Sequence, residues 1–362
     1  MTITDLISVR LDNQQISSTE MTQPREVVEW LGAVQAQDYS GAKWSVASRL
    51  PGTTDADIEK AISDKEIIRT WAMRGTLHFL SRSDIYWMLS FLSPRLEGIM
   101  GTHFRKLELD KKTLNKSKKI IEETLIDGKQ LTRKEIATAL QKKKIATNDM
   151  RITFMLLHAS YERLICFGPR RGKEYTHTLL EEWVKPAELL EYDEALKKLT
   201  LRYFGSHGPA TMQDFAWWSG LTLTDVKRGL EMSGSKLQSV KIKEQLYWMP
   251  KEHSALPKTS TAVFLLAGFD EYIVAYKDRS AVLHPQHVKA VMGLGNGIFN
   301  NTVLVNGKVA GVWKRTFQKQ KVNIDFAMFG DTSEVVKKKI LTASKRFGKF
   351  LEMPVMTSFS EG

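Results

Sequence analysis

Apolar and polar positions follow two different periods along the chain, and the change from a helical to a strand period recurs. In the middle of the chain, Thr132 and Glu135 stand three positions apart before a run with helical spacing, which predicts a capped helix. A second helix is expected over about 148–163, and the segment after it, LICFGPRRGKEYTHTLL, has turn residues between two strand-like runs. Two helices followed by a β-hairpin are the layout of a winged helix.

The same order of elements is expected after this middle segment. Thr211 caps a predicted helix over 212–219, and Gly220 ends it. A further helix follows, and strand-like runs then cover 237–242 and 245–249.

The N-terminal segment is less regular but has similar elements. Pro24 suits the first turn of a helix with an apolar stripe, and Thr54 caps a second helix. The run IIRTWAMRGTLHFLS then predicts two strands joined at Arg74, and Ser83 is expected to cap the next helix.

From about residue 261 onward the pattern changes to strands. Asn306-Gly307 is a strong signal for a tight hairpin, and the last helix is expected over about 333–351 with a basic face. We interpret this region as a small β-barrel-like domain with a terminal helix. The strand-rich runs are VFLLAGFDEYIVAY, NTVLVNGKVAGVWKR and QKVNIDFAMFG.

The predicted fold class is therefore α+β, with three tandem winged-helix modules followed by a small β-barrel domain. A chain of 362 residues is too long for one ordinary core, which agrees with several modules. The expected domains are 1–100, 101–190, 191–258 and 259–362.

The charge adds a functional indication. The formal net charge is +12, and the stretch 101–151 carries 14 Lys or Arg against 7 Asp or Glu. A localised basic excess favours a phosphate-facing surface, and a solvated helical face is the alternative. The chain has one cysteine, no bilayer-length apolar run and no signal peptide, so a cytoplasmic, nucleoid-associated protein is expected.

The most unusual segment, GAVQAQDYSGAKWSVASRL, places Gln35 and Gln37 two positions apart. Residues two apart point to different sides of a helix but share one side of an extended stretch. An apolar stripe predicts that the preceding helix reaches about Val34, and Gly41 follows soon after. The pair is therefore expected where a helix gives way to a loop, with both amides facing one point. The alternative is two ordinary surface or capping glutamines, since spacing alone does not distinguish them.

Three blocks of the sequence resemble the AlkZ-type DNA glycosylases, a winged-helix family that excises alkylated purines and unhooks interstrand crosslinks. In family order the blocks are VQAQDYSGAKWSVASRL, RTWAMRGTLHFLSRSD and LLAGFDEYIVAYKDRSAVL. The resemblance implies three winged helices and a β-barrel in a C-shaped arrangement around a concave DNA-binding channel. The family's catalytic signature is glutamine, an apolar residue, then glutamine or aspartate, and it falls here on Gln35-Ala36-Gln37.

Two amides suit only a substrate that is already activated. A glutamine amide does not titrate near neutral pH, but its oxygen can face a developing sugar cation and accept a hydrogen bond from water. A purine alkylated at N7 or N3 already carries positive charge and leaves as a neutral base. We expect Gln37 to orient the water, and Gln35 to stabilise the sugar cation and hold Gln37. Asp38 could act as a true base, but its side chain should point away from Gln37.

Candidate DNA-binding residues lie on three predicted hairpins. On the first hairpin, Arg69 and Trp71 share one face. In the functional interpretation, Trp71 lies near a modified base and the arginines contact phosphate. In the structural alternative, Trp71 is a core residue and His78 is a strand residue whose polar atoms are hydrogen-bonded within the protein. The resemblance implies that a hairpin of the barrel region contacts DNA, whereas the alternative for Lys308 is a protective edge lysine. The candidates are Arg69, Trp71, Arg74, Arg170, Arg171, Lys173, Lys308, Lys314 and Arg315.

No cofactor or metal is expected. The glycine-rich stretch 293–297 lacks the helix and the Lys-Ser/Thr of a phosphate loop, and His284 with His287 would need a third metal ligand. The expected partner is double-stranded DNA with alkylated bases or crosslinks, bound by a monomer. No lysine stands at the motif, so a monofunctional glycosylase without a lyase step is expected. The competing functions are a non-catalytic winged-helix DNA-binding protein or transcription regulator, and an RNA-binding protein.

Overall fold

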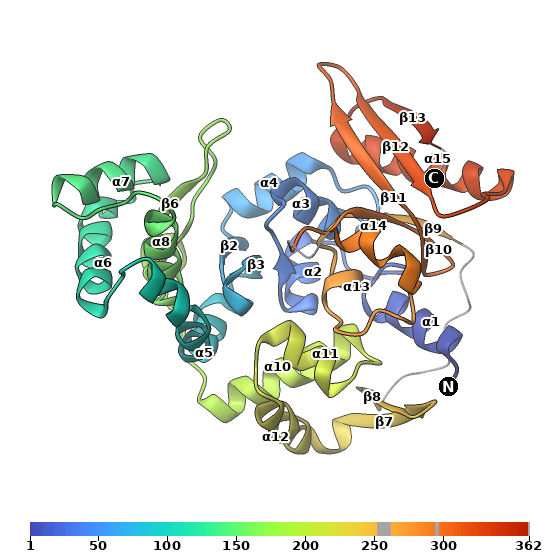
Figure 1. Ribbon diagram of the computed structural model, residues 1–362, viewed down its shortest axis with the longest axis horizontal. Coiled ribbons are helices and arrows are strands. Elements are labelled where there is room, and N and C mark those ends of the chain that lie inside the picture. The colour runs from blue at the N-terminus through green and yellow to red at the C-terminus, as the bar shows by residue number, and fades with distance from the viewer. Residues whose placement is uncertain (252–261, 294–296, 361–362) are drawn as a thin grey trace. The chain divides into compact units, whose positions relative to one another are not determined.

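The computed structural model describes residues 1–251, 262–293 and 297–360 (Figure 1). The chain divides into two compact units. Unit 1 contains residues 1–59 and 197–362, and unit 2 contains residues 60–196. Within the described residues, no helix combines the length and the apolar character that crossing a bilayer requires.

Unit 2 is built from helices and short hairpins. Helix α4, Asp55–Ser63, leads into it, and the unit ends inside α10, Tyr192–His207. Its elements in chain order are β2 (Ile67–Trp71), β3 (Leu77–Ser81), α5 (Ile85–Lys106), α6 (Lys111–Leu125), β4 (Leu131–Thr132), α7 (Arg133–Lys142), α8 (Arg151–Tyr161), β5 (Ile165–Phe167), β6 (Thr176–Leu179) and α9 (Leu180–Trp183).

The middle segment follows its local signals closely. Thr132 and Glu135 form the predicted capping box at the start of α7, whose buried side is formed by Ile136 and Leu140. Helix α8 follows, and β6 then pairs with both β5 and β4. The expected order of two helices and a basic hairpin is therefore present in unit 2.

The first hairpin, β2–β3, has Arg69 opposite Phe79 and Trp71 opposite Leu77. Arg74 lies in its turn with φ of 56°, a conformation that non-glycine residues seldom adopt. The expectation that Ser83 caps the next helix is wrong. Helix α5 begins one residue later, with Asp84 in the N-cap position.

Unit 1 contains the two ends of the chain. Its helices are α1 (Ile3–Asn13), α2 (Pro24–Leu31), α3 (Tyr39–Ala47), α11 (Met212–Ser219), α12 (Leu223–Ser233), α13 (Glu271–Val274), α14 (Val288–Met292) and α15 (Glu334–Leu351). Its strands are β1 (Val34–Gln35), β7 (Leu237–Ile242), β8 (Gln245–Pro250), β9 (Val263–Leu266), β10 (Asn301–Val305), β11 (Lys308–Phe317), β12 (Val322–Met328) and β13 (Val355–Ser360).

The strands after residue 261 form an open sheet in the order β13-β12-β11-β10-β9, so the described strands close no barrel. Closure would need pairing between the two edge strands, β9 and β13. Instead, β13 adds in parallel to β12, and α15 contacts both edge strands. Phe347 of α15 meets Trp313 of the sheet and Trp44 of α3 edge-on, with ring centroids 5.1 and 4.9 Å apart. The predicted barrel is thus corrected to a five-stranded sheet covered by a helix.

Part of the predicted first strand of this region is also wrong. Strand β9 covers only 263–266, and the sequence that follows turns into the short helix α13. Asp270 is the cause, because its side chain accepts a hydrogen bond from the backbone N–H of Tyr272 and caps the helix. The backbone therefore leaves the extended conformation at this point, although the sequence pattern predicts a strand-rich run.

Candidate active site

The glutamine pair lies in an extended segment between two helices. Helix α2 ends at Leu31, three residues before the expected end, because Gly32 takes a φ of 80°. A side chain at Gly32 would come within 3.3 Å of Trp218, so this position also requires the close approach that glycine allows. Strand β1 follows at once, and α3 begins at Tyr39.

The two amides meet on one side of this segment. The side-chain amide Nε2 of Gln35 donates a hydrogen bond to Oε1 of Gln37 at 3.0 Å. Ala36 between them is fully buried. Gln35 is only 7% exposed, whereas Gln37 is exposed. A buried glutamine thus holds an exposed one, as the extended spacing of two predicts.

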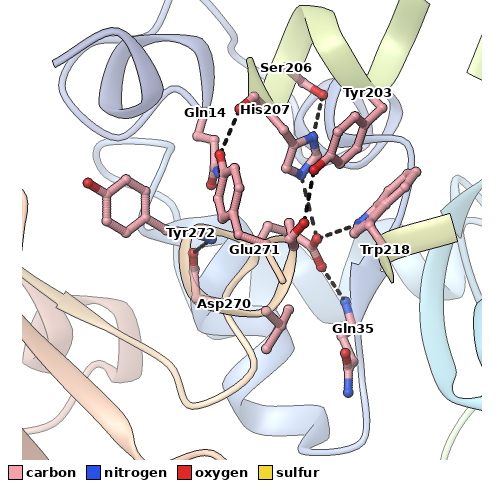
Figure 2. A network of polar contacts seen from close by, with 12 residues as sticks. Gln14, Gln35, Tyr203, Ser206, His207, Trp218, Asp270, Glu271 and Tyr272 are labelled. Atoms are coloured by element: carbon pink, nitrogen blue, oxygen red, sulfur yellow. Dashed lines mark hydrogen bonds and ion pairs between the residues drawn. The ribbon is translucent and has the colours of Figure 1, made fainter. Parts of the chain in front are cut away.

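A buried carboxylate accepts a hydrogen bond from the backbone of the glutamine motif (Figure 2). Glu271, 1% exposed, accepts the backbone N–H of Gln35 on Oε1 at 3.1 Å. Its Oε2 accepts the indole N–H of Trp218 at 2.8 Å, and Nε2 of His207 lies 3.5 Å from the same oxygen. Burial, as the largest effect, lowers the pKa of His207, so its ring is neutral near pH 7.

The adjacent carboxylate, Asp270, binds a buried arginine. Arg49 of the segment after α3 pairs with both of its oxygens at 2.8 and 2.9 Å, and Ser45 donates to it at 2.7 Å. Burial by itself would raise the pKa of Asp270, but the charge and hydrogen bonds of Arg49, with Ser45, hold that pKa below its ordinary value. Asp270 is therefore ionised and fixes α3 to the start of α13.

The N-terminal helix α1 extends this buried network. Gln14, the residue after α1, accepts a hydrogen bond from Arg49 and donates one to the hydroxyl of Tyr276 at 2.9 Å. Arg10 of α1 lies 3.8 Å over the ring of Tyr276 and 3.9 Å from Asp214. The sequence reasoning missed this network. The feature of the sequence that could have indicated this network is the pair of acidic residues in the apolar run AGFDEYIVAY, because adjacent carboxylates in a buried segment require partners.

The charged residues closest to the motif in sequence are paired. Asp38 accepts a hydrogen bond from Arg315 at 2.7 Å. Lys43, 3% exposed, donates to Asp55 and Glu59 at 2.7 Å each. The ammonium group of Lys43 is thus held by two carboxylates, which suits a cation rather than a neutral nucleophile.

Arg69 and Trp71 of the first hairpin lie in a pocket of unit 2 of about 410 Å³. Arg69 is 4% exposed and lies over the rings of Phe167 and Tyr175, at 4.6 and 4.4 Å from their centroids. Trp71 is partly exposed and packs against Phe167 and the buried His177. Arg133, Lys134 and Lys173 also line this pocket.

The remaining predicted DNA-binding residues of unit 2 are at turns. Arg74 is partly exposed in the β2–β3 turn, and Arg170, Arg171 and Lys173 are exposed in the connection between β5 and β6. Arg171 forms an ion pair with Glu135 of α7 at 2.8 Å.

The other three predicted DNA-binding residues lie on the sheet of unit 1. Lys308 and Lys314 are exposed, and Arg315 is partly exposed. The Asn306-Gly307 turn beside Lys308 packs against α1: a side chain at Gly307 would come within 2.3 Å of Ile7. Lys314 and Arg315 lie at the far end of β11, next to the exposed segment 316–320, which the sequence reasoning did not single out.

The histidines have structural contacts. His78 is buried, and its Nδ1 lies 3.0 Å from the carbonyl oxygen of Thr76. His287 stacks on Phe329 with ring centroids 4.0 Å apart. In the described parts of the chain, no group of three or more His, Cys, Asp or Glu could hold a metal ion. The glycine-rich stretch at 294–296 lies outside the described residues.

Comparison with known proteins identifies the family. A family model described as DNA glycosylase AlkZ-like matches residues 28–350. An interstrand DNA cross-link repair glycosylase from Streptomyces sahachiroi is 29% identical over 325 residues, covering 84% of this chain and 85% of that protein. The solved structure of Streptomyces sahachiroi DNA glycosylase AlkZ aligns with a TM-score of 0.83 and 24% identity, covering 99% of this chain and all of that one. The chain therefore belongs to the AlkZ-like DNA glycosylase family.

Proposed function

We propose that this chain is a monofunctional DNA glycosylase that hydrolyses the N-glycosidic bond of purines alkylated at N7 or N3. Unhooking of interstrand crosslinks at such purines belongs to the same proposal, because the Streptomyces relative is named for crosslink repair. The observation that carries it is the contact between the buried Gln35 and the exposed Gln37 in a member of this family.

The two amides have different tasks in this proposal. An amide oxygen can accept two hydrogen bonds, and Gln35 occupies one acceptor position on Oε1 of Gln37. The second position can accept a proton of the attacking water and orient it toward the sugar. The oxygen of Gln35 supplies a fixed dipole to the oxocarbenium-like transition state. Neither group protonates the base, so the substrate must already be cationic.

The geometry around the motif supports hydrolysis without a lyase step. Lyase chemistry needs a neutral amine that can attack the sugar. Lys43, the lysine on the helix that follows the motif, is buried between Asp55 and Glu59. Water oriented by Gln37 is therefore the nucleophile.

DNA is bound by helix–helix–hairpin segments that serve as winged-helix modules, with the chain acting as a monomer. The order α7, α8 and β5–β6, and the order α11, α12 and β7–β8, support this interpretation. The aromatic and basic pocket around Arg69 and Trp71 suits a nucleotide, since bases stack on rings and arginine binds phosphate. Lys314 and Arg315 place further positive charge on the sheet of unit 1.

The test is base excision under single-turnover conditions. Duplexes with one N7-methylguanine, one N3-methyladenine or one N7-linked interstrand crosslink are incubated with the protein, and hot alkali then cleaves each abasic site. We expect excision by the wild type and a loss of about 100- to 1000-fold in Gln37→Ala, comparable to the removal of one transition-state contact in other enzymes. Gln35→Ala should lose less, because Gln37 keeps its own oxygen.

Gln286→Ala is the matched control, since Gln286 is an exposed glutamine of the short turn Pro285–His287, outside the segments proposed to bind DNA. It should excise at the wild-type rate. A wild-type protein that binds these duplexes but cleaves none of them would contradict the glycosylase proposal and favour a DNA-binding protein without catalysis. Wild-type rates in both motif variants would contradict the assignment of Gln35 and Gln37.

A further inference from the structure

Glu271 is a buried carboxylate whose partners come from three separate segments of unit 1. It is the first residue of α13 and is 1% exposed. Its oxygens receive the backbone N–H of Gln35 from β1 and the indole N–H of Trp218 from α11, with His207 of α10 alongside (Figure 2). A buried carboxylate is costly unless donors surround it, so this arrangement specifies where each donor must lie.

Asp270 and Glu271 are neighbours in sequence but have different tasks. Asp270 binds the cation Arg49 and caps α13, which fixes the position of the backbone at this point. Glu271 receives N–H groups, of which one belongs to the backbone of the catalytic motif. The first carboxylate therefore stabilises the fold, and the second connects that fold to Gln35.

The neighbours of Glu271 fix its carboxylate group. Trp218 is 1% exposed, and its ring also limits the space beside Gly32 at the entry to the motif. His207 is fully buried with a pKa lowered mainly by burial, and its Nδ1 lies 2.8 Å from the hydroxyl of Ser206. Rigid aromatic partners leave the carboxylate little freedom to turn.

We propose that Glu271 is a positioning residue for the reaction: by accepting the N–H of Gln35 it fixes the peptide plane from which the Gln35 side chain extends. That side chain in turn holds the amide of Gln37 at 3.0 Å. The order of contacts therefore runs from Trp218 and Glu271 to Gln35 and then to Gln37. This inference rests on the proposed function, because it assigns Glu271 a role in the excision that the two glutamines perform.

Glu271→Gln is the principal test, because it keeps the size of the side chain but replaces one acceptor oxygen with a donor NH₂. One of the two N–H groups of Gln35 and Trp218 then loses its acceptor. We expect the single-turnover rate on N7-methylguanine duplex to fall about 10- to 100-fold, the scale of a small misplacement of a catalytic group. The dissociation constant for undamaged duplex should not change, because Glu271 is buried.

Asp84→Asn is the matched control. Asp84 in unit 2 is fully buried and accepts an indole N–H, that of Trp87, at 2.8 Å, and the hydroxyl of Ser81 at 2.7 Å. It thus accepts an indole N–H as Glu271 does, but it belongs to the other unit of the chain. Its substitution should lower stability, but the rate per folded molecule should equal that of the wild type.

Amide hydrogen exchange at Gln35 provides a readout that does not depend on activity. We expect faster exchange of the Gln35 N–H in Glu271→Gln, and wild-type exchange there in Asp84→Asn. Unchanged exchange at Gln35, or a wild-type excision rate in folded Glu271→Gln, overturns the inference. A wild type that excises no base overturns the proposed function instead, and exchange then decides whether Glu271 holds the motif.

Trp218→Phe is the second variant, should Glu271→Gln fail to fold. It removes one N–H from Glu271 and leaves the contact to Gln35 in place. We expect a rate loss smaller than about tenfold together with measurably faster exchange at Gln35. A rate and an exchange both equal to those of the wild type overturn the inference.

Discussion

Arg49 and Arg69 are both buried arginines, one in each unit, but the protein stabilises their charges in different ways. All five N–H groups of Arg49 donate hydrogen bonds within unit 1. Arg69 lies against the rings of Phe167 and Tyr175 in the pocket of unit 2. A carboxylate neutralises a cation, whereas a ring face attracts it and leaves the charge in place. Arg49 therefore has a structural role, whereas Arg69 packs on rings in the pocket that we propose to bind DNA.

The two regions also differ in the kind of interaction that fixes the positions of their side chains. Around the motif, directed hydrogen bonds to Glu271 and Asp270 determine the positions of the side chains. In the pocket of unit 2, Trp71, Phe167 and His177 pack as rings. We infer that the first region serves a reaction with strict geometry, and the second accommodates a flexible chain of nucleotides.

Substitution of the two arginines gives the largest expected effects. Arg49→Met leaves Asp270 buried without its cation, so the free energy of unfolding should fall by about 3–5 kcal/mol. Arg69→Met should cost about 2 kcal/mol and lower the affinity for duplex DNA, with a salt dependence reduced by about one phosphate contact. Urea denaturation and DNA titrations at several salt concentrations measure both. Equal stability loss with unchanged DNA affinity in Arg69→Met would remove the distinction between the two residues.

The free energy of unfolding should depend on pH because His177 is buried among the packed rings of unit 2. Burial lowers the pKa of His177 to about 3. In the unfolded chain this histidine takes up a proton near pH 6.5, so its contribution to stability is complete above that pH and is lost as the pH falls toward 3. Between pH 7 and pH 5 the loss is about 2 kcal/mol, because each pH unit below about pH 6.5 costs about 1.4 kcal/mol.

His177→Phe removes this titration and keeps a ring between Trp71 and Phe167. Urea denaturation at pH 7 and pH 5 should show a smaller difference for this variant than for the wild type. His287→Gln is the control, because His287 is partly exposed and stacks on Phe329. A variant His177→Phe with the full wild-type pH dependence would show that other groups cause the loss.

Sequence patterns over a few residues predicted the helix caps and strands that depend on contacts between near neighbours. Thr132 and Thr211 cap their helices as expected, each in a capping box with the acidic residue three positions later, and strands β7 and β8 lie where the alternation placed them. These features depend on neighbours within a few positions. The extended form of the glutamine segment agrees with the spacing of two, although the apolar stripe placed the end of the preceding helix three residues too late.

Tertiary contacts determined the rest, and the sequence did not reveal them. Strand β13 pairs with β12 from a distant part of the chain, and the carboxylate of Asp270 that caps α13 is buried against Arg49. Glu271 meets Gln35 across 236 positions of sequence. Its importance depends on this long-range contact, and the residue type alone carries no such information.

The smallest expected effect concerns Asp38, the acid next to the motif and the alternative candidate for a catalytic base. Its carboxylate accepts a hydrogen bond from Arg315, and Gly41 leaves room for this arrangement because a side chain there would come within 2.6 Å of Asp38. A half-exposed pair of this kind contributes less than about 1 kcal/mol, so Asp38→Asn should change the excision rate by less than about fivefold. At saturating protein concentration the excision rate of Arg315→Met should match it, because both variants break the same pair, whereas its affinity for DNA should fall with the loss of the positive charge. A loss in Asp38→Asn as large as that of Gln37→Ala, with Arg315→Met still active, would make Asp38 the base and would assign the glutamine pair a positioning role.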